Sequence, residues 1–188
     1  CRVRGVDVRF NSGVGAVNTL SGRVTGVQLA DGTRVEAPVV VNAAGPWSND
    51  LLQDSQQAQR WTLVPTRIQV MYLDLPSELQ GGIPVSLDMH SGVYFRQQNR
   101  GQQLVVGSAR EVDEQEVVTS PDNFDLQPDE DFRVDRLHAL HHRIPGLPYR
   151  GKVRGYCGLY TVNRQDMHPL VGESDISGFY LANGFSGH

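Results

Sequence analysis

The feature that most constrains the fold is the run Val39-Val40-Val41, which is apolar at every residue. A strand of this kind is typical of a parallel sheet that is covered on both faces. The run ends in Asn42-Ala43-Ala44-Gly45-Pro46, whose small residues allow backbone to approach a ligand at the carboxyl end of the strand. A tight strand-to-helix turn without a ligand explains the same pattern.

A second glycine-rich segment also follows a predicted strand. Residues 179–182 predict the strand, and Asn183-Gly184-Phe185-Ser186-Gly187-His188 follows it. We expect this segment to lead into a helix, whose first backbone N–H groups would hold a negatively charged group. Taken alone, the segment is explained equally well as an ordinary strand-to-helix turn.

Short strands are predicted along most of the remaining sequence. Val6, Val8 and Phe10 alternate with polar residues, and residues 24–29 do so with one slip around Gly26, which indicates a meander. Further strands are predicted at residues 66–73, 85–88, 92–97, 103–108 and 153–156. Asn99-Arg100-Gly101 is typical of a hairpin turn between two of these strands.

One long helix is predicted to begin at Pro128 and to end before Pro145-Gly146. Acidic residues at 129–131 and basic or histidine residues at 138–143 complement the helix dipole. The predicted buried stripe consists of Leu137, Leu140 and Ile144. The pattern indicates an α+β fold, a mostly antiparallel sheet with few helices, plus a remnant of an α/β lobe.

Two shorter segments complete the assignment of elements. Ser48 or Asn49 could cap a short helix that runs through Leu51 and Leu52. Residues 111–127 are polar and acidic, which predicts a solvated surface loop.

Composition excludes several classes of protein. The net charge of −4 argues against a broad nucleic-acid surface, and no apolar run reaches the roughly 20 residues that cross a bilayer. Cys1 and Cys157 cannot form a disulfide framework, which favours the cytoplasm, or the mitochondrial matrix in a eukaryote. Because the sequence opens without a methionine and stops at Gly187-His188, we expect a piece of a longer protein.

In their order and spacing, the two glycine-rich segments resemble the D-amino acid oxidase family of FAD-dependent oxidoreductases. This family includes glycine oxidases, sarcosine oxidases and dehydrogenases, and dimethylglycine dehydrogenase. Its recurrent phrases match residues 40–48 and 184–188, and further matches follow in order at residues 92–96, 104–107, 158–161 and 168–172. The resemblance covers nearly the whole chain.

The resemblance implies an FAD lobe and a substrate lobe whose antiparallel sheet covers the flavin. Residues 1–60 would belong to the FAD lobe, residues 61–160 to the substrate lobe, and residues 161–188 to a strand that returns to the FAD lobe. The Gly-x-Gly-x-x-Gly fingerprint of such proteins is absent from the sequence, so we expect the chain by itself to bind FAD poorly. The cofactor-binding positions that the resemblance implies are Ala43, Ala44, Gly45, Trp47, Gly158, Gly184, Phe185, Ser186, Gly187 and His188.

Substrate-binding positions also follow from the resemblance. Tyr160 matches the position where sarcosine oxidases carry a tyrosine that faces the substrate carboxylate, although a core tyrosine is the alternative. Tyr94 and Arg96 share one face of a strand in the pocket wall. Arg96 and Arg110 could each pair with a carboxylate, or could be ordinary surface arginines. No residue is identified as a general base.

Two departures from the family pattern bear on the reaction. Val105 stands where monomeric sarcosine oxidases carry a lysine that assists reaction with oxygen, which favours a dehydrogenase. Cys157 lies one residue further from Tyr160-Thr161 than the cysteine that binds flavin covalently in those enzymes. Since a one-residue shift reverses the side-chain face of a strand, a buried thiol is the better interpretation.

The expected function is the removal of a hydride from the carbon beside the nitrogen of a small (N-methyl) amino acid or related amine, with FAD as cofactor. One alternative is a non-catalytic flavoprotein module that acts in the assembly of a larger complex or interacts with it. Another is a dehydrogenase of the same family that acts on a hydroxy acid or polyol phosphate. The sequence identifies no electron acceptor. His138, His141 and His142 fit a helix C-terminus, and no metal site is predicted.

Overall fold

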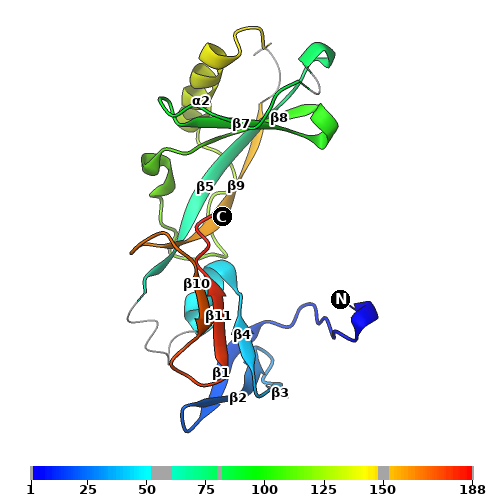
Figure 1. Cartoon of the computed structure of the whole chain (residues 1–188), viewed down its shortest axis with the longest axis vertical. Coiled ribbons are helices and arrows are strands. Elements are labelled where there is room, and N and C mark those ends of the chain that lie inside the picture. The colour runs from blue at the N-terminus through cyan, green and yellow to red at the C-terminus, as the bar shows by residue number, and fades with distance from the viewer. Residues whose placement is uncertain (1, 52–60, 80–81, 148–152, 188) are drawn as a thin grey trace. The chain divides into compact units, whose positions relative to one another are not determined.

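The computed structural model describes residues 2–51, 61–79, 82–147 and 153–187 (Figure 1). The chain divides into two compact units: unit 1 comprises Cys1–Val64 and Thr161–His188, and unit 2 comprises Pro65–Tyr160. The described residues form mostly antiparallel sheets with few helices, which confirms the predicted α+β class. Among these residues, no helix is long and apolar enough to cross a membrane.

Unit 1 contains an antiparallel meander of β1 (Val14–Leu20), β2 (Arg23–Leu29) and β3 (Arg34–Glu36). The slip that the sequence predicts around Gly26 is confirmed as a register shift between β1 and β2. Gly26 has a φ of 149°, and a Cβ at this position would overlap the carbonyl of Val35 in β3. Glycine is therefore the residue that lets the bulged strand lie against β3.

The predicted strand through Val6, Val8 and Phe10 is wrong. After the 3-10 helix η1 (Arg2–Arg4), the backbone is irregular until β1 begins. The Val6 and Phe10 side chains are exposed. Alternation of apolar and polar residues does not suffice here, because no described strand lies beside this segment to take up its backbone hydrogen bonds.

A second, three-stranded sheet in unit 1 holds the two glycine-rich segments. It consists of β4 (Val40–Asn42), β10 (Leu170–Glu173) and β11 (Phe179–Asn183), in the order β10-β11-β4. β11 is antiparallel to β10 and parallel to β4. The buried residues of the apolar cluster on one face of this sheet are Val24, Leu63, Leu170, Ile176, Phe179 and Leu181.

The prediction that β4 is covered on both faces is wrong for the described chain. Val41 is 59% exposed, and Val171 in β10 is also exposed. Phe179 and Leu181 of β11 are buried. Successive side chains of a strand point to opposite faces, so one face of the sheet packs on the apolar cluster and the other is open. The parallel pairing is confirmed.

The segment after β4 also differs from the prediction. It forms the 3-10 helix η2 (Gly45–Leu51), which begins before Ser48 and buries that side chain. Ser48 and Asn49 therefore lie inside the helix and do not cap it. Leu52 lies outside the described residues.

Unit 2 is built on a five-stranded sheet in the order β6-β7-β8-β5-β9. Its strands are β5 (Leu63–Asp74), β6 (Ser86–Leu87), β7 (Val93–Gln98), β8 (Gln103–Ser108) and β9 (Arg154–Asn163). The predicted strands of this region are confirmed, although β5 and β9 are longer. The short 3-10 helices are η3 (Ser77–Leu79), η4 (Asn99–Gly101) in the predicted β7–β8 turn, and η5 (Glu111–Glu114).

The long helix α2 (Glu130–Arg143) packs on one face of this sheet (Figure 1). Leu140 is fully buried, and Leu137 and Ile144 pack against the same core, as predicted. Phe132 and Arg136 are also buried in the helix, which the apolar pattern did not predict. We call the helix-side face of the sheet, which carries Met71, Leu73, Phe95 and Val106, the covered face.

Residues 111–127 are more tightly held than a solvated loop. Val117 forms an isolated antiparallel bridge with Thr66 of β5, and Val118 is buried. Glu116 forms an ion pair of 2.7 Å with Arg67, whose side chain is only 2% exposed. The prediction missed this because the acidic partners of a buried arginine look like ordinary surface charge in the sequence.

Candidate functional site

The first candidate region comprises residues 42–48, which follow β4, and residues 183–187, which follow β11. We call it the turn pair. Val40 lies opposite Phe179 and Asn42 opposite Leu181, in parallel register. The two strands therefore end at the same edge of the sheet, which is where open α/β sheets bind cofactors. Within unit 1, hydrogen bonds from Asn183 to Ser48 and to the Asn42 carbonyl also join the two segments.

Buried polar side chains cross-link the turn pair. Ser48 donates its one hydroxyl proton to the Gly45 carbonyl at 2.5 Å. It therefore accepts a hydrogen bond from the Asn183 amide nitrogen at 2.7 Å, and this orientation of the amide also brings that nitrogen within 3.1 Å of the Asn42 carbonyl oxygen. Asn42 closes its own turn, since its Oδ1 accepts from the Ala44 N–H at 3.1 Å and its Nδ2 donates to the Ser48 carbonyl at 3.0 Å.

A third strand end supports the second turn. The Ser186 backbone N–H donates to the Thr161 carbonyl at 3.1 Å, and the Asn163 backbone N–H lies 3.3 Å from Ser186 Oγ. Strands β4, β9 and β11 thus each end in an asparagine that is at most 2% exposed. The sequence analysis did not single out Ser48 or these asparagines. The signal that could have found them is three strand patterns that each end in asparagine.

The other predicted cofactor positions of unit 1 lie on the same turns. Ala43 and Trp47 belong to the first, and the ring of Trp47 is partly exposed. Phe185, Ser186 and Gly187 belong to the second; Phe185 is partly exposed and Ser186 is buried. His188 lies outside the described residues.

The turn pair has the properties that binding one end of FAD requires. Gly45 and Gly184 adopt left-handed φ values of 54° and 68°, and Gly187 has a φ of 90°. Gly45 leaves backbone uncovered by a Cβ, so that a flat ring can approach it, whereas at Gly184 the Leu63 side chain already fills that space. The phosphate-binding fingerprint is absent from the sequence. These residues therefore fit part of the cofactor, and the rest of it requires other segments.

The second candidate region is the open face of the sheet in unit 2, which we call the tyrosine face. It is defined by Tyr72, Tyr94, Arg96, Val105, Arg154, Tyr156 and Tyr160. Tyr72 and Arg96 each lie opposite Val105 in the strand register, and Tyr94 lies opposite Gly107. Side chains directly opposite each other share a face, and the core residues Met71, Phe95 and Val106 occupy the other one.

Two glycines shape the tyrosine face. A Cβ at Gly107 would overlap the ring of Tyr94, so the ring lies over the bare backbone of β8. A Cβ at Gly158 in β9 would meet no atom, so β9 presents uncovered backbone at a predicted cofactor position.

Two phenols of this face, Tyr94 and Tyr160, have raised pKa values. Burial raises the pKa of Tyr94, and the negative charges of nearby Tyr160 and Glu114 act in the same direction. Burial also raises the pKa of Tyr160, with smaller contributions from Glu114 and Tyr156. Both hydroxyl groups can therefore donate hydrogen bonds to an anionic substrate group over the whole physiological range.

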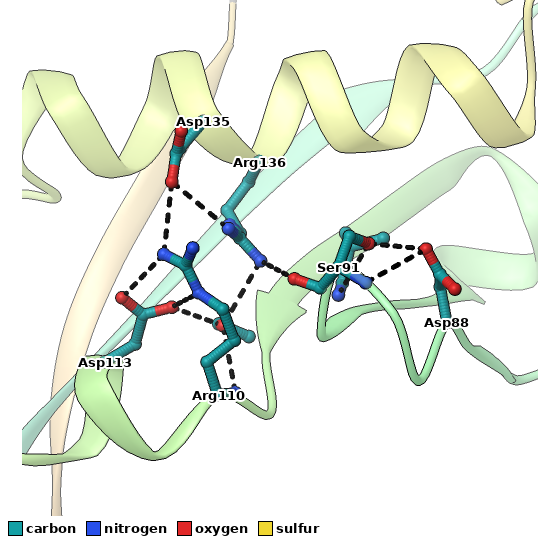
Figure 2. Close-up of polar contacts among 8 residues, drawn as sticks. Asp88, Ser91, Arg110, Asp113, Asp135 and Arg136 are labelled. Carbon is teal, nitrogen blue, oxygen red and sulfur yellow. Dashed lines mark hydrogen bonds and ion pairs between the residues drawn. The ribbon is translucent and has the colours of Figure 1, made fainter.

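The two arginines predicted to bind a carboxylate differ in their surroundings. Arg96 is exposed on the tyrosine face, forms no ion pair with any described residue, and lies 3.5 Å from the Gln97 carbonyl. Arg110 lies beyond the end of β8, next to α2. It forms ion pairs of 2.9 Å with Asp113 and 3.1 Å with Asp135 (Figure 2).

The Arg110 ion pairs are part of a larger network on the covered side. Figure 2 shows Arg136 between Asp135 and the Ser91 carbonyl, to which it donates at 2.9 Å. The hydrogen bonds that Arg110 donates to Asp113 raise the pKa of Arg110. Burial would raise the pKa of Asp113, but hydrogen bonds from Arg110 and Ser108 outweigh it, so this pKa is lowered. The charge of Arg110 is thus already balanced within the protein.

Cys157 lies on the covered face. It is buried, whereas Tyr156 and Tyr160 of the same strand belong to the tyrosine face. Burial raises the pKa of its thiol, although nearby Arg67 acts in the opposite direction. The thiol is therefore protonated at neutral pH and points away from the predicted substrate residues.

Comparison with known proteins identifies curated relatives that match most of the chain. The protein named FAD-dependent oxidoreductase domain-containing protein 1 of Bos taurus is 30% identical over 165 residues, which covers 82% of this chain and 33% of the relative. The protein of the same name from Xenopus laevis is 27% identical, with 82% of this chain and 32% of the relative covered. The chain thus spans about a third of the length of these curated relatives.

Solved structures share the fold. Fructosyl peptide oxidase (a thermally stable mutant) matches 100% of this chain and 47% of its own, with a TM-score of 0.77 and 20% identity. L-Proline dehydrogenase from P. horikoshii matches 94% of this chain and 45% of its own, with a TM-score of 0.73 and 21% identity. Glycine oxidase from Bacillus cereus matches 98% and 47%, with a TM-score of 0.72 and 20% identity.

The family assignment rests on the extent of the sequence match. The family model described as FAD dependent oxidoreductase (DAO) matches residues 1–188. The match contains both segments of the turn pair and all strands of the tyrosine face, and so agrees with the resemblance read from the sequence. The chain therefore belongs to the DAO family of FAD-dependent oxidoreductases.

Proposed function

We propose that this chain supplies part of the flavin site and the substrate-binding face of an enzyme that oxidises a carbon–nitrogen bond of a small amino acid or related amine. N-methylated amino acids are the preferred class. The observation that carries the proposal is the parallel pairing of β4 with β11, because it brings the two glycine-rich segments of the family together.

The residues of the chain have separate roles in this proposal. FAD, when bound, accepts a hydride from the carbon beside the substrate nitrogen. Ala43, Ala44, Gly45 and Trp47 on one turn, and residues 184–187 on the other, would hold the flavin. Gly158 allows close approach to β9. The turn backbone contributes N–H groups, which favour the negative charge that a flavin gains on reduction.

Arg96 on β7 and Tyr160 on β9 are separate candidate contacts for the substrate carboxylate, since β8 and β5 lie between their strands. An arginine without an ion pair can form a charge-assisted pair with a carboxylate, and a protonated phenol can add a neutral hydrogen bond. Tyr94 forms an aromatic wall beside them. Arg110 has no part in the proposal, since Asp113 and Asp135 already compensate its charge. Hydride transfer from a neutral amine needs no general base, so none is assigned.

The charge inventory of the tyrosine face favours an amino acid over a polyol phosphate. Arg96 and Arg154 are its cations, and Arg154 pairs with Asp74 at 2.7 Å while it stacks on Tyr72. One arginine without an ion pair suits a single carboxylate, whereas a phosphate dianion calls for several.

Val105 supports a dehydrogenase that passes electrons to an acceptor other than oxygen. It lies opposite both Tyr72 and Arg96 and brings no charge to this face. A Val105→Lys variant would supply a cation there, which favours superoxide formation. We expect it to accelerate reoxidation of the reduced enzyme by oxygen by about tenfold, and Val105→Met to leave the rate unchanged. Equal reoxidation rates in the two variants would show that the residue at position 105 does not control the reaction with oxygen.

The main experiment uses the full-length protein that contains this chain. Flavin bleaching is recorded under anaerobic conditions with a panel of N-methylated amino acids, D-amino acids, hydroxy acids and polyol phosphates. Bleaching by a member of the amino-acid sets is expected. Bleaching only by hydroxy acids or polyol phosphates would contradict the amine proposal and identify one of those compounds as the substrate class. A fully flavin-loaded protein that none of the compounds bleaches would favour the non-catalytic module.

A further inference from the structure

We propose that Asn42, Ser48 and Asn183 are positioning residues for the flavin, which fix the separation of the two turns in the turn pair. The inference rests on the proposed function, because it takes the turn pair as part of the flavin site. These three side chains are between 0% and 2% exposed, so they would act through the backbone of the turns and not by direct contact with substrate.

The backbone pairing of the two strands does not reach the turns. The parallel register between β4 and β11 ends where Asn42 lies opposite Leu181. Beyond this point the two segments depart as separate turns, each with a left-handed glycine, and side chains must connect them. Asn183 makes that connection, since its amide nitrogen reaches both Ser48 Oγ at 2.7 Å and the Asn42 carbonyl at 3.1 Å.

The network extends the connection through the first turn. The Ser48 hydroxyl, which accepts from Asn183, donates in turn to the Gly45 carbonyl. The Asn42 side chain accepts a hydrogen bond from the Ala44 N–H and donates one to the Ser48 carbonyl. Movement of one turn therefore strains hydrogen bonds in the other.

The chemistry of the network suits positioning better than stabilisation alone. Buried pairs of polar groups can often be replaced by apolar groups of the same shape at little cost in stability. Hydrogen bonds, unlike apolar packing, depend on direction and hold groups at a defined distance. A flavin that must receive a hydride needs its ring placed to within a fraction of an ångström, which is where such rigidity has value.

The chain contains a matched control. Asn163 is as buried as Asn183 and also ends a strand. Its backbone N–H contacts Ser186 of the second turn and is kept in any variant, whereas, among the described residues, its side-chain amide donates only to Asp166 Oδ1 and the His168 carbonyl, both at 2.8 Å. Replacement of Asn163 should cost stability by the same mechanism without releasing the Ser48–Asn183 connection.

The test compares Ser48→Ala, Asn183→Leu and Asn163→Leu in the full-length protein. Thermal unfolding, the Kd for FAD by fluorescence titration of the apoprotein, and the visible circular dichroism of the bound flavin are measured. We expect Ser48→Ala and Asn183→Leu to weaken FAD binding by about tenfold and to change the flavin dichroism. Asn163→Leu should lower the unfolding temperature comparably but leave the Kd within about twofold of wild type. Ser48→Thr, which keeps the hydroxyl, should restore both flavin measurements.

The outcomes separate this inference from the proposed function. Wild-type protein that fails to bind FAD overturns the proposed function, and the inference with it. FAD binding and dichroism that are unchanged in Ser48→Ala overturn the inference alone. So does an Asn163→Leu variant that affects the flavin as strongly as Asn183→Leu, because the effect is then general loss of stability. If Asn183→Leu does not fold, Ser48→Ala and its Thr rescue decide the question.

Discussion

Arg96 on the tyrosine face differs from the arginines on the covered side of the five-stranded sheet in having no ion pair with the described residues. On the covered side, Arg67, Arg110 and Arg136 are each held by carboxylates or carbonyl groups of the protein. On the tyrosine face, Arg96 is exposed and forms no ion pair with the described residues. Both faces carry aromatic or apolar residues and cations. An arginine whose charge is balanced by protein groups has a structural role, whereas an arginine without an ion pair is a candidate for ligand binding.

The largest effect is expected from Arg67→Leu, on the covered side. Arg67 donates to Glu116, Asp129 and the carbonyl groups of Asp125 and Gln127, and thereby holds residues 116–129 against β5. Its removal leaves these acceptors without their partner and should destabilise unit 2 by about 3 kcal/mol. Thermal unfolding of the full-length protein measures the loss, with the exposed Arg100→Leu as control. A shift as small as that of the control would show that residues 116–129 are held without Arg67.

The arginine comparison itself is tested by Arg96→Gln and Arg110→Gln. Loss of a charge-assisted bond to a carboxylate costs about 2 kcal/mol, so Arg96→Gln should raise the KM for a carboxylated substrate by about thirtyfold. Its unfolding temperature should remain unchanged. Arg110→Gln should do the reverse, with a lower unfolding temperature and an unchanged KM. If Arg110→Gln raised the KM and Arg96→Gln lowered the unfolding temperature instead, Arg110 would be the substrate residue and Arg96 the structural one.

Acid should act on the covered side through its carboxylates. Hydrogen bonds from Arg67 lower the pKa of Asp129, and the pKa of Asp113 is also lowered. A carboxylate with a lowered folded pKa stabilises the fold above its unfolded value, which is 3.8, and loses this as the pH falls through the folded pKa. The unfolding temperature should therefore be steady near neutrality and fall below about pH 4. Asp113→Asn should make the fall shallower; an unaltered slope would mean that Asp113 contributes nothing to it.

The smallest effect is expected from Tyr160→Phe on the tyrosine face. The change removes one neutral hydrogen-bond donor, which is worth about 1 kcal/mol, so substrate affinity should fall by about fivefold. Tyr72→Phe is the control, since its ring stacks under Arg154, which pairs with Asp74. Anaerobic titration of the flavin spectrum with substrate measures both. Equal affinities in wild type and Tyr160→Phe would remove Tyr160 from the site.

Sequence patterns predicted the elements whose partners lie close along the chain. β7, β8 and their turn at Asn99-Arg100-Gly101 were found because alternation and turn chemistry are local properties. The exposure of Val41 was not predicted. Burial depends on what packs against a strand, and the sequence of the strand alone does not contain that information. The false strand at Val6 has the same origin.

The candidate site divides in the same way. The glycine-rich segments that form the turn pair follow directly from sequence motifs. The Asn42–Ser48–Asn183 network does not, since it joins residues 135 positions apart, and each asparagine alone is an ordinary strand end. The contrast between Arg96 and Arg110 was also hidden, because the carboxylates that hold Arg110 come from η5 and α2.

The chain order of the two units determines when the turn pair can form during synthesis. All of unit 2 lies between β4 and β11, so the ribosome completes Pro65–Tyr160 before it makes the strand that pairs with β4. Unit 2 has its own core and can fold while β4 waits without a partner. Closure of the small sheet is then the late, long-range step, and slowed translation or a mutation that delays unit 2 would prolong the exposure of Val40 and Val41 to aggregation.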